Sequence, residues 1–365
     1  MNRIKAVQSY INNIFDNIKE PAEQRAAYIH SYGVSQLCAL LAQQKGLDVE
    51  IAAAVGLLHD VYSYKTGIRS LHGHNGSEMI RVAFKYELKG LFSPQEQLII
   101  KSAVYHHSDK EHLHDEYDEL LKDSDVLQHY LYDTSEDLYV SRRLVRAATQ
   151  LKITLSESVK TEMRKAEPFE QKRAGDIAEE LAQKKIAGTR DDPFYMDIIK
   201  YFPENSAFSE LDHAWCAAFV YHCCRKAGLV LPIRIPNNAE NPVNCRFACV
   251  VAWYEWAKAN GYCFKEEEGF SPQRGDIVVY NNIIPKECKA ENSAWCDHIG
   301  IVTGCEKDFL IVAEGNVGNK NVSGILKREH NETIGCYIRI PSDYNYDVWK
   351  VDYKSGKLRE ELYAG

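Results

Sequence analysis

Long apolar segments are missing from this sequence of 365 residues. No run approaches the ~18 apolar residues that a membrane-spanning helix needs. Residues 1–20 also have no apolar core of the kind that a signal peptide requires. These absences predict a cytoplasmic protein that has no membrane partner.

An excess of basic residues is missing as well. The chain has 44 Lys and Arg against 52 Asp and Glu, a formal net charge of -8, so no nucleic-acid partner is expected. With 11 Pro, 21 Gly and 45% hydrophobic residues, the composition is that of an ordinary globular protein and excludes extended disorder. Internal repeats, heptads and glycine-rich phosphate loops are absent. The length is about two to three times that of a typical domain, which predicts two domains.

Cysteine pairs with the spacing of a zinc site are also missing, although the chain has 11 cysteines. No CxxC motif occurs, and all cysteines except Cys38 lie in the second half. The odd count argues against a fully paired disulfide framework and agrees with a reducing compartment. Most of these cysteines are therefore interpreted as small buried residues. The histidines are distributed the other way, because nine of the 13 lie between His30 and His129.

The hydrophobic pattern predicts two domains of different class. Residues 1–165 have helical periodicity almost throughout and no convincing alternating strand, which predicts an all-α bundle. After residue 172 the pattern changes to helices followed by short β-rich runs, which indicates an α+β domain with an antiparallel sheet. The predicted order is an all-α domain over 1–150, a helical linker over 151–171, an α+β domain over 172–341 and a tail over 342–365.

The predicted helices of the first domain cover residues 22–45, 49–60, 74–90, 94–107 and 116–132. Those of the second domain cover 172–186, 193–201, 214–228 and 246–260, and the predicted strands cover 275–280, 298–304, 309–315 and 336–340.

Metal-ligating side chains stand at the ends of apolar helices in the first domain. His30 lies in AAYIHSYGV, the pair His59 and Asp60 ends IAAAVGLLHD, and Asp125 lies in LLKDSDVLQ. A buried imidazole or carboxylate needs a partner, and one divalent metal can satisfy all four. Imidazole together with carboxylate favours iron, manganese, zinc or nickel over calcium. Asp123 is the alternative to Asp125 as the last ligand.

Residues 20–135 resemble the HD-domain metal-dependent phosphohydrolases. The resemblance lies in the order of the candidate ligands along the chain, a His, then a His-Asp pair, then an Asp, each on its own predicted helix. The resemblance implies that His30, His59, Asp60 and Asp125 are metal ligands and that one or two divalent transition metals are bound. It also implies hydrolysis of a phosphate ester in a nucleotide or a small phosphomonoester. Such a metal lowers the pKa of a bound water and polarises the phosphoryl group. Asp60 would then also help to position that water.

Further residues of this domain are candidates for a second metal or for the substrate phosphate, roles that histidines at similar places have in the family. These candidates are His74, His106, His107 and Arg25, joined for phosphate contact by Lys65, Arg69 and Lys122. The remaining histidines of the domain are interpreted as surface residues: His72, His112, His114 and His129.

One cysteine differs from the others by its position. Cys216 opens the predicted helix in DHAWCAAFVYHCCRKAG, with Asp212 as its predicted cap. Its thiol therefore lies in the first turn, where the helix dipole favours the thiolate. A thiolate needs a base and a group that orients this base. His298 opens a predicted strand, and Glu314 and Asn316 follow the next strand.

Four segments in the order WCAAFV, RGDIVVY, DHIGIVTG and AEGN make residues 172–341 similar to the CHAP family, the cysteine, histidine-dependent amidohydrolases and peptidases. The resemblance implies a papain-like fold, with Cys216 as nucleophile and His298 as general base. It also implies that Glu314 and Asn316 orient the imidazole or line the oxyanion site. The substrate would be an amide or a peptide, with peptidoglycan fragments among the candidates.

Two features depart from this pattern. Cys223 and Cys224 are alternative nucleophiles, although they lie two turns into the helix. Residues 281–296 form a longer insertion than the resemblance implies and are expected to cover the cleft.

The leading hypothesis is a two-domain hydrolase, in which a metal-dependent phosphohydrolase is joined to a Cys-His amidase or peptidase. A second hypothesis makes the first half a nucleotide-sensing module that regulates the cysteine hydrolase, in a phage-lysin, toxin or defence context. A third hypothesis is a non-catalytic scaffold.

Overall fold

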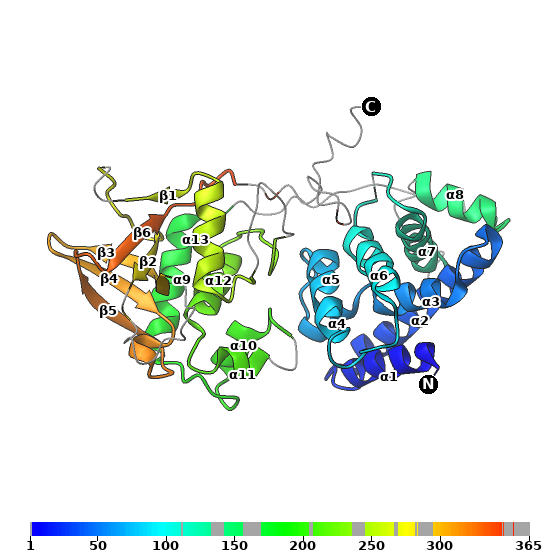
Figure 1. Ribbon diagram of the computed structural model, residues 1–365, viewed down its shortest axis with the longest axis horizontal. Coiled ribbons are helices and arrows are strands. Elements are labelled where there is room, and N and C mark those ends of the chain that lie inside the picture. The colour runs from blue at the N-terminus through cyan, green and yellow to red at the C-terminus, as the bar shows by residue number, and fades with distance from the viewer. Residues whose placement is uncertain are drawn as a thin grey trace. The chain divides into compact units, whose positions relative to one another are not determined.

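The structure is a computed structural model, and the chain in it divides into two compact units, Met1–Lys165 and Ala166–Gly365 (Figure 1). It describes residues 2–110, 112–132, 142–155, 169–203, 207–235, 245–265, 269–281, 283, 295–344, 346 and 353. Most of the predicted linker, tail and insertion at 281–296 lies outside these residues.

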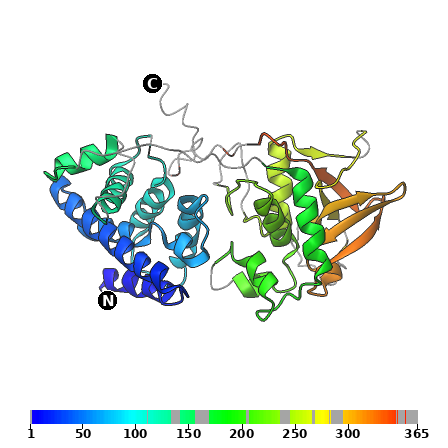
Figure 2. The ribbon, with the colours of Figure 1, turned by 180° about the vertical axis from the view of Figure 1, so that it is seen from behind.

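The described part of the first unit contains only helices and their connections, which confirms the predicted all-α class. Figure 2 shows the long helix α2, in blue, along one side of this bundle. The helices are α1 (Arg3–Phe15), α2 (Pro21–Lys45), α3 (Val49–Leu58), α4 (Val61–Thr66), α5 (His72–Ala83), α6 (Pro94–His106), α7 (Glu116–Tyr132) and α8 (Arg142–Gln150).

Capping residues set the ends of several of these helices. Asp48 accepts hydrogen bonds from the backbone N–H groups at the start of α3, and Ser93 and Glu96 form a capping box at the start of α6. Helix α2 ends at Gly46, which has a left-handed φ of 70°. Helix α1 was not predicted, although its buried residues recur at a helical spacing.

Close packing of α3 against α2 brings polar helix ends together in the bundle. A Cβ on Gly56 would lie 2.5 Å from the Cα of Ser35, so only glycine allows this approach. Two residues later α3 ends at Leu58, and His59 and Asp60 follow at the break before α4. The close approach therefore places His59 opposite His30 on α2.

The second unit combines helices with one antiparallel sheet, as predicted. The sheet has six strands in the order β1-β6-β2-β3-β4-β5, and every pair is antiparallel. Helices α9, α12 and α13 lie on one side of it (Figures 1 and 2). The elements are α9 (Gln171–Gln183), α10 (Pro193–Ile199), α11 (Ala207–Leu211), α12 (Cys216–Lys226), α13 (Val250–Ala259), β1 (Cys263–Phe264), β2 (Ile277–Asn281), β3 (Cys296–Cys305), β4 (Phe309–Glu314), β5 (Gly324–Glu329) and β6 (Ile334–Ile338).

The four predicted strands correspond to β2, β3, β4 and β6, whereas β1 and β5 were not predicted. Strand β5 reads GILKRE, and most of its residues are only half-buried. It lies at the sheet edge beside β4, where a strand needs fewer apolar residues. The weak apolar signal at 324–329 is a consequence of that position.

In the described part of the chain, no helix combines the length and the apolar character that crossing a membrane requires.

We expect Gly275→Ala to destabilise the second unit much more than Gly269→Ala. Both glycines have a positive φ, of 91° and 79°, so both alanine variants carry the left-handed strain of ~1–2 kcal/mol. At Gly275 a Cβ would also lie 1.9 Å from the carbonyl oxygen of Gln171, whereas at Gly269 no atom of the described residues beyond its chain neighbours lies within 4 Å. The clash should add at least ~2 kcal/mol to the loss in free energy of unfolding, measured by urea denaturation. Equal losses for the two variants would contradict this account.

Candidate functional sites

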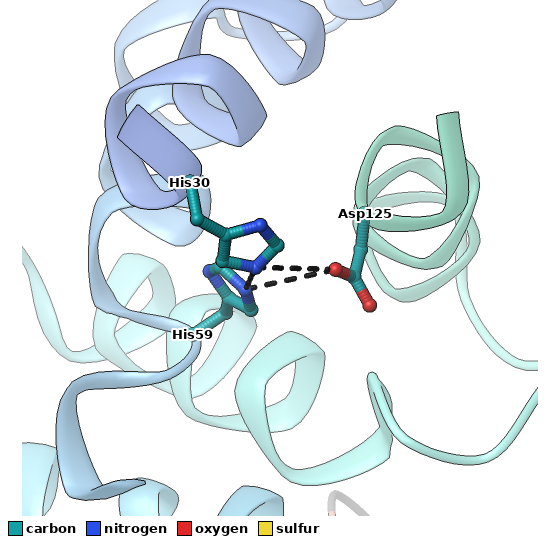
Figure 3. A group of neighbouring side chains, drawn as sticks. All are labelled: His30, His59 and Asp125. Atoms are coloured by element: carbon teal, nitrogen blue, oxygen red, sulfur yellow. Dashed lines mark hydrogen bonds and ion pairs between the residues drawn. The ribbon is translucent and has the colours of Figure 1, made fainter. Parts of the chain in front are cut away.

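Three polar side chains converge in the first unit from three helices (Figure 3). His30 comes from α2, His59 from the end of α3 and Asp125 from α7. The Nε2 atoms of His30 and His59 lie 3.0 Å apart, and Asp125 Oδ1 lies 3.4 Å and 3.9 Å from them. The three side chains form a group that could hold a metal ion, with one ligand atom from each.

The other ring nitrogens of this histidine pair are already hydrogen-bonded. His59 Nδ1 donates to the carbonyl oxygen of Gly56 at 2.8 Å, and His30 Nδ1 lies 2.5 Å from the amide oxygen of Gln128. Neutral imidazoles in these positions carry their proton on Nδ1, so both Nε2 lone pairs face the same point. Gly33 makes room for Gln128, because a Cβ there would lie 2.9 Å from its Cγ.

A second group repeats this arrangement next to the first. His72 Nε2 and His107 Nε2 lie 2.8 Å apart, while their Nδ1 atoms donate to the carbonyl oxygens of Arg69 and Val104, both at 2.7 Å. Asp60 completes the group. His72 is the first residue of α5 and follows Leu71, whose φ of 56° turns the chain sharply at that point.

Asp60 connects the two groups, since each of its carboxylate oxygens faces one of them. Oδ2 lies 3.6 Å from the Nε2 atoms of both His30 and His59. Oδ1 lies 3.1 Å from His72 Nε2 and 3.3 Å from His107 Nε2. The carboxylate therefore has the position of a bridge between two cation sites.

The surroundings hold most of these groups in the protonation states that metal binding needs. Burial lowers the pKa of His30 to about 4, and His59 nearby adds to the effect. Burial also lowers the pKa of His59 and of His107. It would raise the pKa of Asp60, but the adjacent His59, His107 and His72 hold it well below its usual range.

His72 is the exception among these histidines. Burial lowers its pKa, but hydrogen bonding to Asp60 and the charge of that carboxylate outweigh burial and raise the pKa. A proton on His72 Nε2 is thus stabilised where a cation would bind.

Facing nitrogen lone pairs beside two ionised carboxylates need a shared positive charge, and the nitrogen and oxygen donors suit a divalent transition metal. The residues present fit such an ion at each group.

A pocket of about 640 Å³ opens onto both groups. This volume is in the range of small-molecule sites. Four basic residues are among its lining residues, namely Lys19, Lys65, Arg69 and Lys110.

The predicted metal ligands His30, Asp60 and Asp125 line the pocket, and so does His107. His59 is buried and does not line the pocket, but it contacts His30. His72, interpreted as a surface residue, lines it too and belongs to the second group, so that interpretation was wrong. His129 is exposed, as interpreted, although it also lines the pocket. His129 Nε2 lies 3.4 Å from Asp125 Oδ1. Asp123 is not a ligand of these groups, because it pairs with Arg143 and Arg146 instead.

Three predicted candidates lie outside the pocket. His74 is two residues after His72, which turns it to another face of α5, and its ring packs 4.1 Å from that of Tyr105. His106 lies 2.9 Å from Asp118, and Arg25 is exposed on α2. Lys122, a further phosphate candidate, is buried against Glu119.

His106 also belongs to a third group, with His114 and Asp118. His114 is nearly buried and was wrongly interpreted as a surface residue. Its ring stacks on His106 at 3.8 Å with an interplanar angle of 15°. Ring nitrogens hold their lone pairs in the ring plane, so nearly parallel rings do not direct them at one ion. The third group is better described as two separate hydrogen bonds, from His106 to Asp118 and from His114 to Asp109, each of 2.9 Å.

The second unit brings Cys216, His298 and Glu314 together. Cys216 is the first residue of α12, His298 lies on β3, and Glu314 ends β4. His298 hydrogen-bonds to Cys216, and its Nε2 lies 2.8 Å from Glu314 Oε2, which leaves Nδ1 for the thiol. Gly300 makes room for Glu314, because a Cβ there would lie 2.8 Å from the glutamate Cγ.

Arg328 on β5 forms an ion pair with this glutamate. The sequence did not predict this contact. The Nε and Nη2 of Arg328 donate to the two oxygens of Glu314 at 2.9 Å and 2.6 Å, and Glu314 is fully buried. Burial would raise the pKa of Glu314, but His298 and Arg328 lower it. Burial would lower the pKa of His298, but the charges of Glu314 and Cys216 outweigh it and raise this pKa to about 10. The site therefore favours an imidazolium beside the thiol.

Asn316 does not contact His298 in its described hydrogen bonds. Its side-chain amide donates to the carbonyl oxygen of His213 and accepts from the backbone N–H of Asn321 at 2.9 Å. It thereby fixes the loop that leads to Cys216. The predicted cap is also wrong, because Trp215 is the residue before the helix and Asp212 makes no capping bond.

The other described cysteines do not share these contacts. Cys223 and Cys224 are fully buried, and burial raises the pKa of both thiols. All ten described cysteines are free thiols.

Comparison with known families agrees with both geometries. Residues 27–130 match the family model of the HD domain, and residues 208–316 match that of the CHAP domain. The chain joins an HD domain to a CHAP domain. This confirms the predicted arrangement, and because both domains are typically hydrolytic, it supports a hydrolase fusion. Searches of curated proteins and of solved structures found no match.

We expect Asp60→Asn to weaken metal binding in both groups of the HD domain, because an amide cannot bridge two cations with two anionic oxygens. Metal content per chain, measured by elemental analysis after reconstitution and dialysis, should fall by more than in His72→Ala, which affects one group. His74→Ala is the matched control, since His74 lies on the same helix outside the pocket, and it should leave the content unchanged. An Asp60→Asn protein with full metal content would rule out the bridging position.

We expect Glu314→Gln to lower the pKa of His298 in the CHAP domain from about 10 toward or below the ordinary value of ~6.5. The variant removes a negative charge that raises this pKa, while burial, which lowers it, stays. Titration of the His298 ring by NMR measures the change, and Glu306→Gln, at an exposed ion pair with Lys327, is the control. Unchanged titration in Glu314→Gln would contradict the assigned cause.

Proposed function

We propose that the HD domain is a phosphohydrolase that uses two divalent transition metals, with iron, manganese, zinc and nickel as the candidates. Its substrate is a phosphate ester in a nucleotide or another phosphorylated small molecule. The observation that carries this proposal is the pair of facing imidazoles on each side of Asp60, with Nε2 distances of 3.0 Å and 2.8 Å.

The ligand residues have separate tasks in this proposal. His30, His59 and Asp125 would hold one ion, His72 and His107 would hold the other, and Asp60 lies where it would serve both. When bound, the ions supply Lewis acidity, which activates a water and polarises the phosphoryl group. The carbonyl oxygens of Gly56 and Arg69 fix the rings of His59 and His72 through their Nδ1 atoms, so the ligand set is preorganised.

The remaining pocket residues act on the substrate. Lys65 and Arg69 are exposed at the pocket lining and attract an anionic ester. Asp60 helps to orient the attacking water. The ring of Tyr64 and the side chains of Ile14 and Ile18 also line the pocket and offer apolar contact to the organic part of the substrate.

We further propose that the CHAP domain is a cysteine amidase or peptidase, with peptidoglycan fragments among its candidate substrates. The Cys216 thiolate attacks the amide carbonyl carbon, and the His298 imidazolium gives its proton to the leaving amine. Neutral His298 then takes a proton from the water that attacks the thioester, and cleavage of the C–S bond releases the acid and restores the thiolate beside the imidazolium. Glu314, held by Arg328, keeps the imidazole in place and stabilises its charged form.

The phosphohydrolase proposal is tested with p-nitrophenyl phosphate and a panel of nucleoside monophosphates on metal-reconstituted protein. We expect His59→Ala to reduce hydrolysis by at least ~100-fold, because it removes one ligand of a metal on which activation of water depends. Cys216→Ala is the control, and hydrolysis of phosphate esters should not change in it. Full activity in metal-stripped protein would reject the proposal.

A further inference from the structure

Lys110 lies beside the metal groups and belongs to none of them. It follows α6 in the connection to α7, and its Nζ donates to Asp125 Oδ2 at 2.6 Å. The other oxygen of this carboxylate, Oδ1, faces His30 and His59. A cation bound at Oδ1 would therefore leave the contact between Lys110 and Oδ2 in place.

The ammonium group of Lys110 also faces the pocket. Lys110 is one of the lining residues, and about a quarter of its side chain, 26%, is exposed. An ammonium group has three N–H donors, and the bond to Asp125 uses one of them. No other hydrogen bond of this ammonium group to a described residue is present, so its remaining donors can contact an anion in the pocket beside the metal groups.

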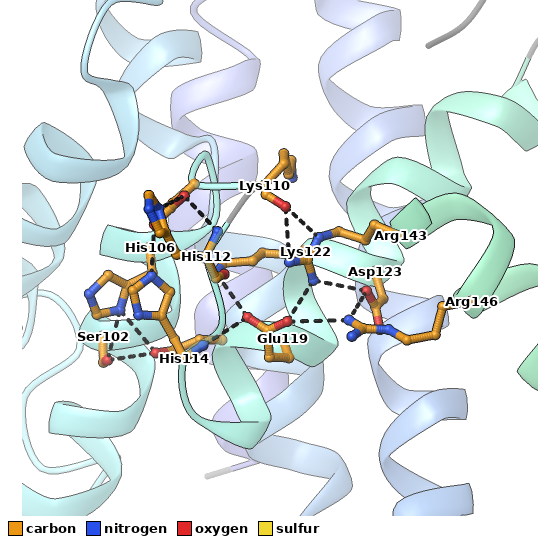
Figure 4. A network of polar contacts seen from close by, with 12 residues as sticks. Ser102, His106, Lys110, His112, His114, Glu119, Lys122, Asp123, Arg143 and Arg146 are labelled. Carbon is orange, nitrogen blue, oxygen red and sulfur yellow. Dashed lines mark hydrogen bonds and ion pairs between the residues drawn. The ribbon is translucent and has the colours of Figure 1, made fainter. Parts of the chain in front are cut away.

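An arginine of α8 holds the backbone of Lys110 in this position. Arg143 Nη2 and Nε donate to the carbonyl oxygen of Lys110 at 3.1 Å and 3.3 Å. Its Nη1 donates to Glu119 at 2.8 Å and to Asp123 at 3.1 Å, both on α7. Figure 4 shows the guanidinium between these acids and Lys110. Arg143 is only 6% exposed, so its orientation is restricted by packing.

We propose that Lys110 is a phosphate-binding residue of the HD site and that Arg143 is the positioning residue that holds it there. The inference rests on the proposed phosphohydrolase function and adds to it a cation that contacts the phosphoryl oxygens directly. Because Asp125 belongs to the metal group and also pairs with Lys110, a phosphoryl group bound there would be within reach of both the metal ligands and the ammonium group. Helix α7 carries both Asp125 and the acids that hold Arg143, so one rigid element sets the whole geometry.

Arg146 offers a matched control for Arg143. It comes from the same helix and pairs with the same acids, at 2.6 Å to Asp123 and 3.2 Å to Glu119. Its described hydrogen bonds do not reach Lys110, and 44% of its side chain is exposed. Loss of Arg146 therefore weakens the α7–α8 ion pairs but keeps the contact with the Lys110 carbonyl.

The experiment measures binding of inorganic phosphate to the metal-reconstituted full chain by calorimetry, together with metal content and KM for p-nitrophenyl phosphate. We expect Lys110→Met to weaken phosphate binding and to raise KM by ~10-fold or more, with metal content unchanged, because a charge-assisted hydrogen bond is lost. Lys110→Arg should restore part of the affinity. Arg143→Ala should weaken phosphate binding by ~3- to 10-fold, and Arg146→Ala by less than ~2-fold.

If Arg143→Ala does not fold, Arg143→Lys replaces it, because lysine keeps the charge beside the acids but cannot reach three acceptors. Wild-type affinity in Lys110→Met, or loss of metal from it, would overturn the role of Lys110. Equal effects of Arg143 and Arg146 variants would overturn the positioning role. If wild-type protein binds phosphate but hydrolyses no ester, the proposed function fails while the Lys110 inference is still decided by the binding data. Absence of phosphate binding in the wild type overturns the inference.

Discussion

Two pairs of imidazole nitrogens face one another at the contact distance of a hydrogen bond, although their ring protons are committed elsewhere. Such an arrangement is repulsive unless a positive charge is shared between the nitrogens, and the groups that face these Nε2 atoms are the carboxylates of Asp60 and Asp125. The rest of the HD domain follows from this constraint. Backbone carbonyls fix the Nδ1 protons, Asp60 faces both pairs, and the pocket gives access from solvent.

The CHAP domain also contains a buried charge that needs a partner of opposite charge. Glu314 is completely buried, and a buried carboxylate is costly unless it is paired. Arg328 and His298 share its two oxygens, so the ion pair that stabilises the glutamate also orients the imidazole. Structural and catalytic demands on β4 and β5 are therefore met by the same contacts.

The sequence was sufficient to predict both fold classes and most of the central residues. The order His30, His59-Asp60 and Asp125 on apolar helices predicted side chains that the fold brings together, and Cys216, His298 and Glu314 were predicted as a set. His72 was missed because a histidine at a helix start, preceded by polar residues, resembles a surface residue in one dimension. Only the left-handed turn at Leu71 brings it to Asp60. Arg328 was missed because its strand lies at the sheet edge, and Lys110 because its role depends on a carbonyl contact that no residue pattern encodes.

Gly56 illustrates how closely packing and chemistry are joined in this chain. The missing side chain lets α3 approach α2, and the carbonyl of the same residue accepts the His59 proton. A substitution at this position would change the distance between two ligand-bearing helices and the tautomer of a ligand at once. Stability and the geometry of this histidine group therefore cannot be varied independently at Gly56.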